Sequence, residues 1–137
     1  MSLRVCEVMS EQDAVMLNAL QLAYIGDSVW ETIIRGILVH RRMNVHHMHS
    51  ECVKLVNAHA QADFLRKLDS FLSDRELEII RRGRNSHAHH SAPKNQNPED
   101  YAAATGFEAL IGYLYMTGQE DRIMKITEII TGGIPDG

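Results

Sequence analysis

The chain has 137 residues, a net charge of −4 and 45% hydrophobic residues, which is typical of one folded domain and excludes a disordered tail. Its longest apolar stretches are too short to span a membrane, and the N-terminus lacks the basic and apolar pattern of a signal peptide. Two cysteines without a CxxC pattern indicate reduced thiols in a cytoplasmic protein. The charge argues against a uniformly basic nucleic-acid binder, although it leaves room for a local basic patch.

Helical periodicity begins at Asp13, after residues 1–12, which carry no clear period and are expected to be loosely ordered. Apolar residues then recur at three- and four-residue spacing as far as Leu38, which predicts helix. Gly26 lies in the middle of this run and indicates a bend or a close helix contact. We expect it to split the run in two and to place Asp27 in the first turn of the second segment.

A polar, basic connection at 40–44 separates this run from the next predicted helix. That helix is expected to be a single long one over about 45–68, with one apolar face. Ser73 and Glu76 then have the spacing of a capping box. The box predicts a further helix that ends at about Arg84.

The segment 83–97 is rich in His, Ser, Asn, Gly and Pro and is predicted to be a loop. Asn97, with a proline and two acids after it, predicts a helix start, and that helix runs to Met116. A last amphipathic helix covers about 120–130, and 132–137 is a short polar tail. Because no alternating strand pattern is present, the predicted fold class is all-α, with five to seven helices in a single domain that spans the whole chain.

Asp27 and Glu108 each place one carboxylate inside a strongly apolar helical run. An ionised carboxylate is costly to bury without a partner, so two such helices in a small domain suggest carboxylates that face each other and share a cation. Oxygen ligands of this kind suit Mg²⁺, which keeps several waters and needs only one or two carboxylates. The alternative is that each acid caps a helix or forms an internal ion pair.

Segments that include these acids resemble the ribonuclease III catalytic domain. Residues 25–29, Ile-Gly-Asp-Ser-Val, and residues 107–115, Phe-Glu-Ala-Leu-Ile-Gly-Tyr-Leu-Tyr, are similar to its two signature segments. Residues 81–85, 93–95 and 103–108 resemble its Mini-ribonuclease III branch, and the likeness spans roughly 14–130. Like that branch, the chain is expected to lack a separate double-stranded-RNA-binding domain.

The resemblance implies a homodimer that cleaves double-stranded RNA with magnesium, one active site per subunit cutting one strand and leaving 5′-phosphate ends. It implies catalytic and metal-binding roles for Asp27 and Glu108, with one or two Mg²⁺ per site and Mn²⁺ as a substitute. In other ribonuclease III enzymes the site has two further acids, at the positions that Ala23 and Thr105 occupy here. The Mini branch also lacks these two acids. The branch is known for maturing the ends of large-subunit ribosomal RNA, and a ribosomal protein that presents the RNA is a natural partner.

A stretch without acids surrounds the predicted loop. Between Ile79 and Pro98 there are four Lys or Arg and no Asp or Glu, while the rest of the chain carries a charge of −8. A basic, flexible loop on an acidic body is the pattern expected for phosphate binding, and amide and hydroxyl groups there can reach ribose 2′-hydroxyls. The predicted RNA-binding residues are Arg81, Arg82, Arg84, Asn85, Ser86, Lys94 and Asn95. The alternative is a solvated surface loop.

Two other hypotheses remain open. One is a non-catalytic, dimeric double-stranded-RNA-binding module that kept the fold after losing two acids. The other is a histidine-dependent metal-binding helical protein in which the acids are structural. Its candidate ligands are His46, His47, His49, His87, His89 and His90. No cysteine at zinc-finger spacing and no HExxH accompanies them, so we interpret the first three as helix-end surface and the last three as weak RNA contacts.

Glu31 and Asp100 lie near the predicted pair along the chain but are not included in it. Glu31 precedes Arg35 by four residues, which favours a helical salt bridge. Asp100 is explained as an acid in the first turn of its helix. Trp30 and the tyrosines after Gly112 are interpreted as core or dimer contacts.

Overall fold

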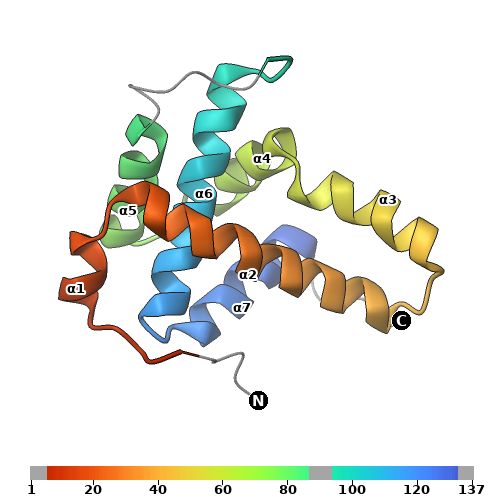
Figure 1. Cartoon of the computed structure of the whole chain (residues 1–137), viewed down its shortest axis with the longest axis horizontal. Coiled ribbons are helices and arrows are strands. Elements are labelled where there is room, and N and C mark those ends of the chain that lie inside the picture. The colour runs from red at the N-terminus through yellow and green to blue at the C-terminus, as the bar shows by residue number, and fades with distance from the viewer. Residues whose placement is uncertain (1–5, 87–93, 133–137) are drawn as a thin grey trace.

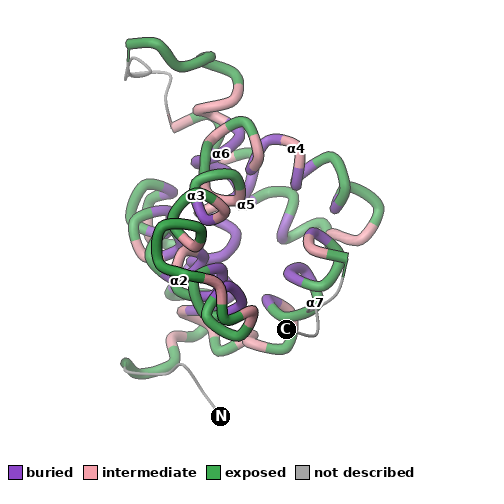
Figure 2. Tube along the Cα trace, turned by 90° about the vertical axis from the view of Figure 1, so that its right-hand side faces the viewer, coloured by how far each residue is buried: buried purple, intermediate pink, exposed green. Residues whose placement is uncertain are grey.

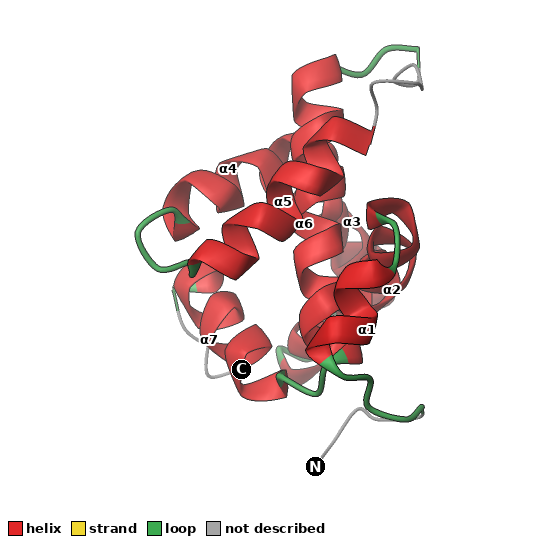
Figure 3. Cartoon of the chain, turned by 90° about the vertical axis from the view of Figure 1, so that its left-hand side faces the viewer, coloured by secondary structure: helices red, strands yellow, loops and turns green. Residues whose placement is uncertain are grey.

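The computed structural model describes residues 6–86 and 94–132, and every regular element in these ranges is a helix (Figures 1 and 3). The helices are α1 (Glu11–Met16), α2 (Ala19–His40), α3 (Val45–Val56), α4 (Ala58–Leu68), α5 (Asp74–Asn85), α6 (Pro98–Met116) and α7 (Glu120–Thr131). The predicted all-α class is therefore confirmed. Within the same ranges no helix has the length and apolar character needed to cross a membrane.

Helix α6 is the element around which the others pack. It contacts α1, α2, α4, α5 and α7, and in Figure 1 α2 runs across it with α5 and α4 on either side. Twelve of its nineteen residues are buried, so it is apolar on nearly all sides, as expected of a helix inside a core. The predicted carboxylate Glu108 lies in the middle of this helix.

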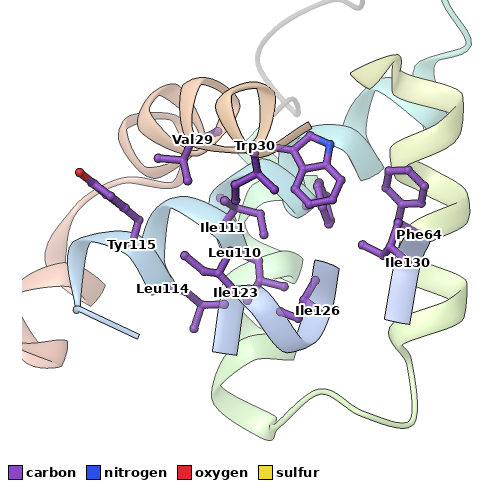
Figure 4. Packing of buried hydrophobic residues seen from close by; sticks show 14 of the residues in the cluster. Val29, Trp30, Phe64, Leu110, Ile111, Leu114, Tyr115, Ile123, Ile126 and Ile130 are labelled. Carbon is purple, nitrogen blue, oxygen red and sulfur yellow. The ribbon is translucent and has the colours of Figure 1, made fainter. Parts of the chain in front are cut away.

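Aromatic rings join α2, α4 and α6 in the core. Trp30, Phe64 and Phe107 meet edge to face, with ring centroids 5.0 to 5.7 Å apart, the geometry that aromatic pairs prefer. Figure 4 shows Trp30 and Phe64 within the buried hydrophobic cluster, to which isoleucines of α7 also belong. Tyr113 and Tyr115 are also buried, so these aromatic residues belong to the core, and in Figure 2 the buried residues gather inside the bundle.

Helix α2 is continuous, and the predicted split at Gly26 is wrong. Of the two explanations for this glycine, the close helix contact is correct, because a Cβ added there would lie 1.7 Å from the carbonyl oxygen of Glu108. Asp27 therefore lies in the middle of a helix of 22 residues and not in a first turn.

The single helix predicted over 45–68 is two helices, which meet at Asn57. The Asn57 backbone is extended, with ψ 160°, and its side-chain oxygen accepts a hydrogen bond from the backbone N–H of Ala60 at 2.8 Å. Asparagine competes with the helix for backbone groups in this way. The break lets α4 leave the direction of α3.

The predicted caps are confirmed. Ser73 and Glu76 form the capping box of α5, and Asn97 caps α6 with a proline in the first turn. Helix α7 ends at Gly132, which has φ 74°, a conformation that favours glycine. Helix α1 begins at Glu11, inside the stretch where no element was expected, because the side chain of Ser10 caps it.

Candidate active site

Two glycines allow the backbones of α2 and α6 to touch. A Cβ on Gly26 would lie 1.7 Å from the carbonyl oxygen of Glu108, and a Cβ on Gly112 would lie 1.9 Å from the carbonyl oxygen of Leu22. Real Cβ atoms do not approach backbone atoms so closely, so only glycine fits at either position. The crossing places Asp27, the residue after Gly26, beside Glu108.

The carboxyl groups of Asp27 and Glu108 interact directly. Asp27 is exposed and Glu108 is half-buried. Burial, together with a hydrogen bond and repulsion from the Asp27 carboxylate, raises the pKa of Glu108 to about 8, and a weaker hydrogen bond from Gln61 opposes the rise. The structure thus brings together the two acids that the sequence singled out, while their catalytic role stays a prediction.

This pair has the chemistry of a cation site. Two carboxyl groups held against each other favour a shared proton or a shared cation, because two like charges at short range cannot both ionise freely. Their oxygen atoms are the ligands that magnesium prefers. Among the described residues no group of three or more His, Cys, Asp or Glu could hold a metal, so a cation here would take its remaining ligands from water and substrate.

Glu108 lies in an open groove between the start of α4, the start of α6 and the segment before α6. The groove is rich in amide side chains. Those that line it are Asn57, Gln61, Asn95, Gln96 and Asn97. Amides can donate to phosphate oxygens and ribose hydroxyls without adding negative charge to the site.

Comparison with known proteins identifies the family. Residues 20–119 match the model of the Ribonuclease III domain. The chain belongs to the ribonuclease III family. A Mini-ribonuclease 3 of Symbiobacterium thermophilum is 41% identical over 122 residues, which cover 88% of this chain and 93% of the relative. A Mini-ribonuclease 3 of Clostridium tetani is 37% identical over 126 residues, covering 90% of this chain and 83% of the relative.

A solved structure shares the fold of this chain. The crystal structure of a Fusobacterium nucleatum protein superimposes with a TM-score of 0.77 at 30% identity, covering 85% of this chain and 93% of that one. This family member is therefore an endoribonuclease of the Mini-ribonuclease 3 branch.

The two positions where this ribonuclease III family member lacks acids are closed to water. Ala23 is 7% and Thr105 is 6% exposed. The Thr105 hydroxyl donates to the carbonyl oxygen of Tyr101 at 3.1 Å. Neither side chain replaces a carboxylate, so of the four acid positions that the resemblance implies only those of Asp27 and Glu108 carry one.

The two neighbouring acids have other partners. Glu31 accepts a hydrogen bond from Arg35 at 2.9 Å, which confirms the predicted salt bridge. Asp100 lies in the first turn of α6, as predicted, and its Oδ2 lies 3.0 Å from Nδ1 of His59 on α4. These contacts support leaving both acids out of the predicted pair.

The predicted basic cluster is divided between a helix and a loop. Gly83, Arg84 and Asn85 belong to α5, which ends at Asn85, so the prediction of a loop from residue 83 is wrong. Lys94 and Asn95 lie before α6, and residues 87–93, with the three loop histidines, are outside the described ranges.

The predicted RNA-binding residues Arg81 and Arg82 make side-chain contacts within the protein. Arg81 pairs with Glu78 on its own helix. Arg82 donates to the carbonyl oxygens of Val15 at 3.1 Å and Leu17 at 2.6 Å. These bonds tie α5 to the last turn of α1 and to the residue that caps it, which favours a structural role for Arg82.

Ser86 donates to the carbonyl oxygen of Gly83 at 2.6 Å and thereby closes the end of α5. Arg84 and Lys94 are both exposed, which leaves them as the stronger candidates for phosphate binding. Their role in RNA binding stays a prediction.

The histidines at the start of α3 form no cluster. All three are exposed, and His47 lies 3.5 Å from Glu51, an ion pair available only when the histidine is protonated. This agrees with their interpretation as helix-end surface.

Sequence reasoning missed one residue of the site. Gln61 on α4 is 1% exposed, and its Nε2 donates to Oε2 of Glu108 at 3.5 Å. A polar residue on a face otherwise made of Phe64, Leu65 and Leu68 is the signal that could have drawn attention to it, because buried amides are seldom left without a hydrogen bond.

Proposed function

We propose that this member of the ribonuclease III family is a magnesium-dependent endonuclease that cleaves double-stranded RNA. Asp27 and Glu108 hold one or two Mg²⁺, and Mn²⁺ can substitute. The observation that carries the proposal is the contact of these two carboxyl groups, of which Glu108 also lines a groove rich in amide side chains. The expected location of the enzyme is the cytoplasm.

The protein contributes geometry and charge to this reaction. When bound, magnesium activates water and neutralises charge on the scissile phosphate and on the leaving oxygen. The glycine contact between α2 and α6 brings together the two stretches of backbone that carry these carboxyl groups. Glu108 has to lose its proton before it can bind a cation, and the raised pKa of this carboxyl makes that release dependent on pH near neutrality.

Cleavage of a long RNA duplex tests the proposal directly. The wild-type protein is expected to cut duplex RNA in Mg²⁺ and to stop in EDTA, while single-stranded RNA and duplex DNA of the same sequence stay intact. The products should carry 5′-phosphate ends. Binding without cleavage in Mg²⁺ would contradict the nuclease and support the alternative, a non-catalytic double-stranded-RNA-binding module.

Arg84 and Lys94 are expected to contact phosphate. Arg84→Ala and Lys94→Ala should each weaken duplex binding, and each should lower the slope of log K against log salt by about one, because one released counterion is lost. Lys125→Ala is the matched control, since Lys125 lies on α7 and pairs with Glu128. Filter binding across a salt series measures the slopes, and equal slopes in all four proteins would place the RNA elsewhere.

A homodimer is part of the proposal. Leu20 and Tyr24 lie one turn apart on α2, and Tyr24 is 85% exposed one turn before Asp27. An exposed apolar pair beside the site is typical of a surface that another chain covers, and a two-fold axis would place two active sites across one duplex. Sedimentation equilibrium at micromolar concentration should give the dimer mass, and a monomer would contradict this part.

The proposed natural substrate is a precursor of large-subunit ribosomal RNA, with a ribosomal protein presenting the duplex. The described ranges form one helical bundle, in which Arg84 and Lys94 are the exposed basic side chains proposed to contact phosphate. A partner that presents the duplex would add to this small RNA-binding surface. Addition of ribosomal protein to a precursor duplex should raise the cleavage rate at the mature ends. An unchanged rate with every ribosomal protein tried would remove the partner from the proposal.

A further inference from the structure

Gln61 is a buried polar residue that faces the proposed metal site. Its side chain is 1% exposed, and a buried amide left without a hydrogen bond costs about 1–3 kcal/mol. Its Nε2 lies 3.5 Å from Oε2 of Glu108, a long hydrogen bond of the kind that shortens when the acceptor becomes fully charged. The amide therefore points at one of the two oxygens of the Glu108 carboxyl.

The helix break at Asn57 places Gln61 there. Helix α4 starts anew at this residue, and the backbone N–H of Gln61 donates to the carbonyl oxygen of Asn57 at 3.1 Å. Three residues further along the same face, Phe64 packs against Phe107, the neighbour of Glu108, with ring centroids 5.7 Å apart. The first two turns of α4 thus dock on the turn of α6 that carries Glu108.

The chemistry of an amide suits the reduced acid content of this site. Ala23 and Thr105 supply no carboxylate, so Glu108 has fewer neighbours to fix its orientation. A neutral donor such as the Gln61 amide, 3.5 Å from Oε2 of Glu108, orients a carboxylate without adding to the repulsion from Asp27.

We propose that Gln61 is a positioning residue that holds Oε2 of Glu108 and leaves the other carboxyl oxygen directed at the cation. This inference rests on the proposed function, since it takes Glu108 to be a metal ligand. Partners that orient metal-binding carboxylates in this way typically contribute about 10–100-fold to metal affinity or activity.

Gln61→Met tests the proposal, because methionine has a similar shape and no donor. Calorimetric titration of the metal-free protein with Mn²⁺, without RNA, should show affinity about tenfold weaker than wild type. Thr127→Val is the matched control: Thr127 is a fully buried polar residue on α7, and its hydroxyl donates to the carbonyl oxygen of Ile123. The control should lose stability and keep the wild-type affinity. Mn²⁺ affinity of Gln61→Met within about twofold of wild type would overturn the proposal.

Gln61→Glu provides an independent test if the methionine variant folds poorly. It places a third carboxylate against Glu108 and Asp27, so the metal-free protein should be less stable than wild type and the rise in Tm on adding Mn²⁺ should be larger. An unchanged rise would show that the side chain at position 61 does not face the cation, which would overturn the proposal.

Glu108→Gln separates the two proposals. Loss of Mn²⁺ affinity in Glu108→Gln combined with wild-type affinity in Gln61→Met would reject the positioning role alone. Wild-type Mn²⁺ affinity and cleavage in Glu108→Gln would reject the proposed function, and the role of Gln61 with it.

Discussion

Glu108→Gln is expected to abolish cleavage of duplex RNA and, at the same time, to stabilise the metal-free protein at pH 8. The loss of cleavage should exceed about 100-fold, the largest effect typical of residues that merely support a metal ligand. Duplex binding should persist, because the change is isosteric and removes no positive charge. Two effects of opposite sign from one substitution distinguish a metal ligand from a residue that holds the fold together.

The gain in stability follows from the pKa of Glu108. Folding raises this pKa from 4.5 to about 8, so between these values the folded state binds more protons than the unfolded state. The free energy of unfolding of the metal-free protein therefore falls as pH rises through this window. One pKa unit corresponds to about 1.4 kcal/mol, so the loss by pH 8 is on the order of a few kcal/mol. Glutamine does not titrate, so the free energy of unfolding of Glu108→Gln should not fall in this way as pH rises.

Urea unfolding in EDTA at pH 5 and pH 8 measures this difference. Wild type should lose stability between the two values, and Glu108→Gln should lose less. Asp27→Asn is the matched control: it removes the neighbouring charge but leaves burial, which is the larger cause of the raised pKa, so part of the pH dependence should remain. Equal pH dependence in wild type and Glu108→Gln would show that Glu108 is ionised in the folded protein without metal.

The sequence predicted the two acids because an isolated carboxylate in an apolar helix is a local anomaly. Asp27 and Glu108 stand out among their neighbours, and the resemblance to ribonuclease III pairs them. It also predicted the caps at Ser73 and Asn97, since a cap depends on residues three positions apart. Isolated acids and helix caps can be recognised in a sequence without knowing what the helix packs against.

The other features of the site depend on contacts between distant segments. From the sequence, Gly26 is compatible with either a helix break or a close helix contact. The contact can be recognised only once α6 is known to pack against it. Asn57 ends one helix and caps the next, yet the apolar pattern on both sides continues the same period. Gln61 reaches Glu108 because the helix breaks at Asn57. Arg82 reaches the carbonyl oxygens of Val15 and Leu17 because α5 packs against the end of α1.

Gly26→Ala is the second substitution with a large expected effect. The added Cβ would lie 1.7 Å from the carbonyl oxygen of Glu108 and 2.7 Å from the backbone N of Gly112. Both are backbone atoms of a buried helix, so α2 and α6 must separate to admit the methyl group. Overpacking a core typically lowers the free energy of unfolding by about 1–3 kcal/mol and occasionally by more. Because the added methyl group meets only backbone atoms, we expect Gly26→Ala to cost about 3 kcal/mol or more.

Gly36→Ala is the matched control on the same helix. A Cβ there would meet nothing within 4 Å, so alanine should raise stability by about 0.8–1 kcal/mol through its higher helix propensity. The two substitutions add the same atom to the same helix, and thermal unfolding should move the Tm in opposite directions. A Tm of Gly26→Ala at or above wild type would mean that the helices cross with more room than the structure shows.

The separation forced by Gly26→Ala should also reach the site. Asp27 follows the glycine directly, and the carbonyl oxygen that is pushed away belongs to Glu108 itself, so the two carboxyl groups must move apart with the helices. Gly26→Ala protein that is still folded at low temperature should therefore bind Mn²⁺ more weakly than wild type, whereas Gly36→Ala protein should bind it equally. Weakened stability with unchanged Mn²⁺ affinity would show that the cation tolerates a wider spacing, and it would shift the role of the glycine contact from the site to the core alone.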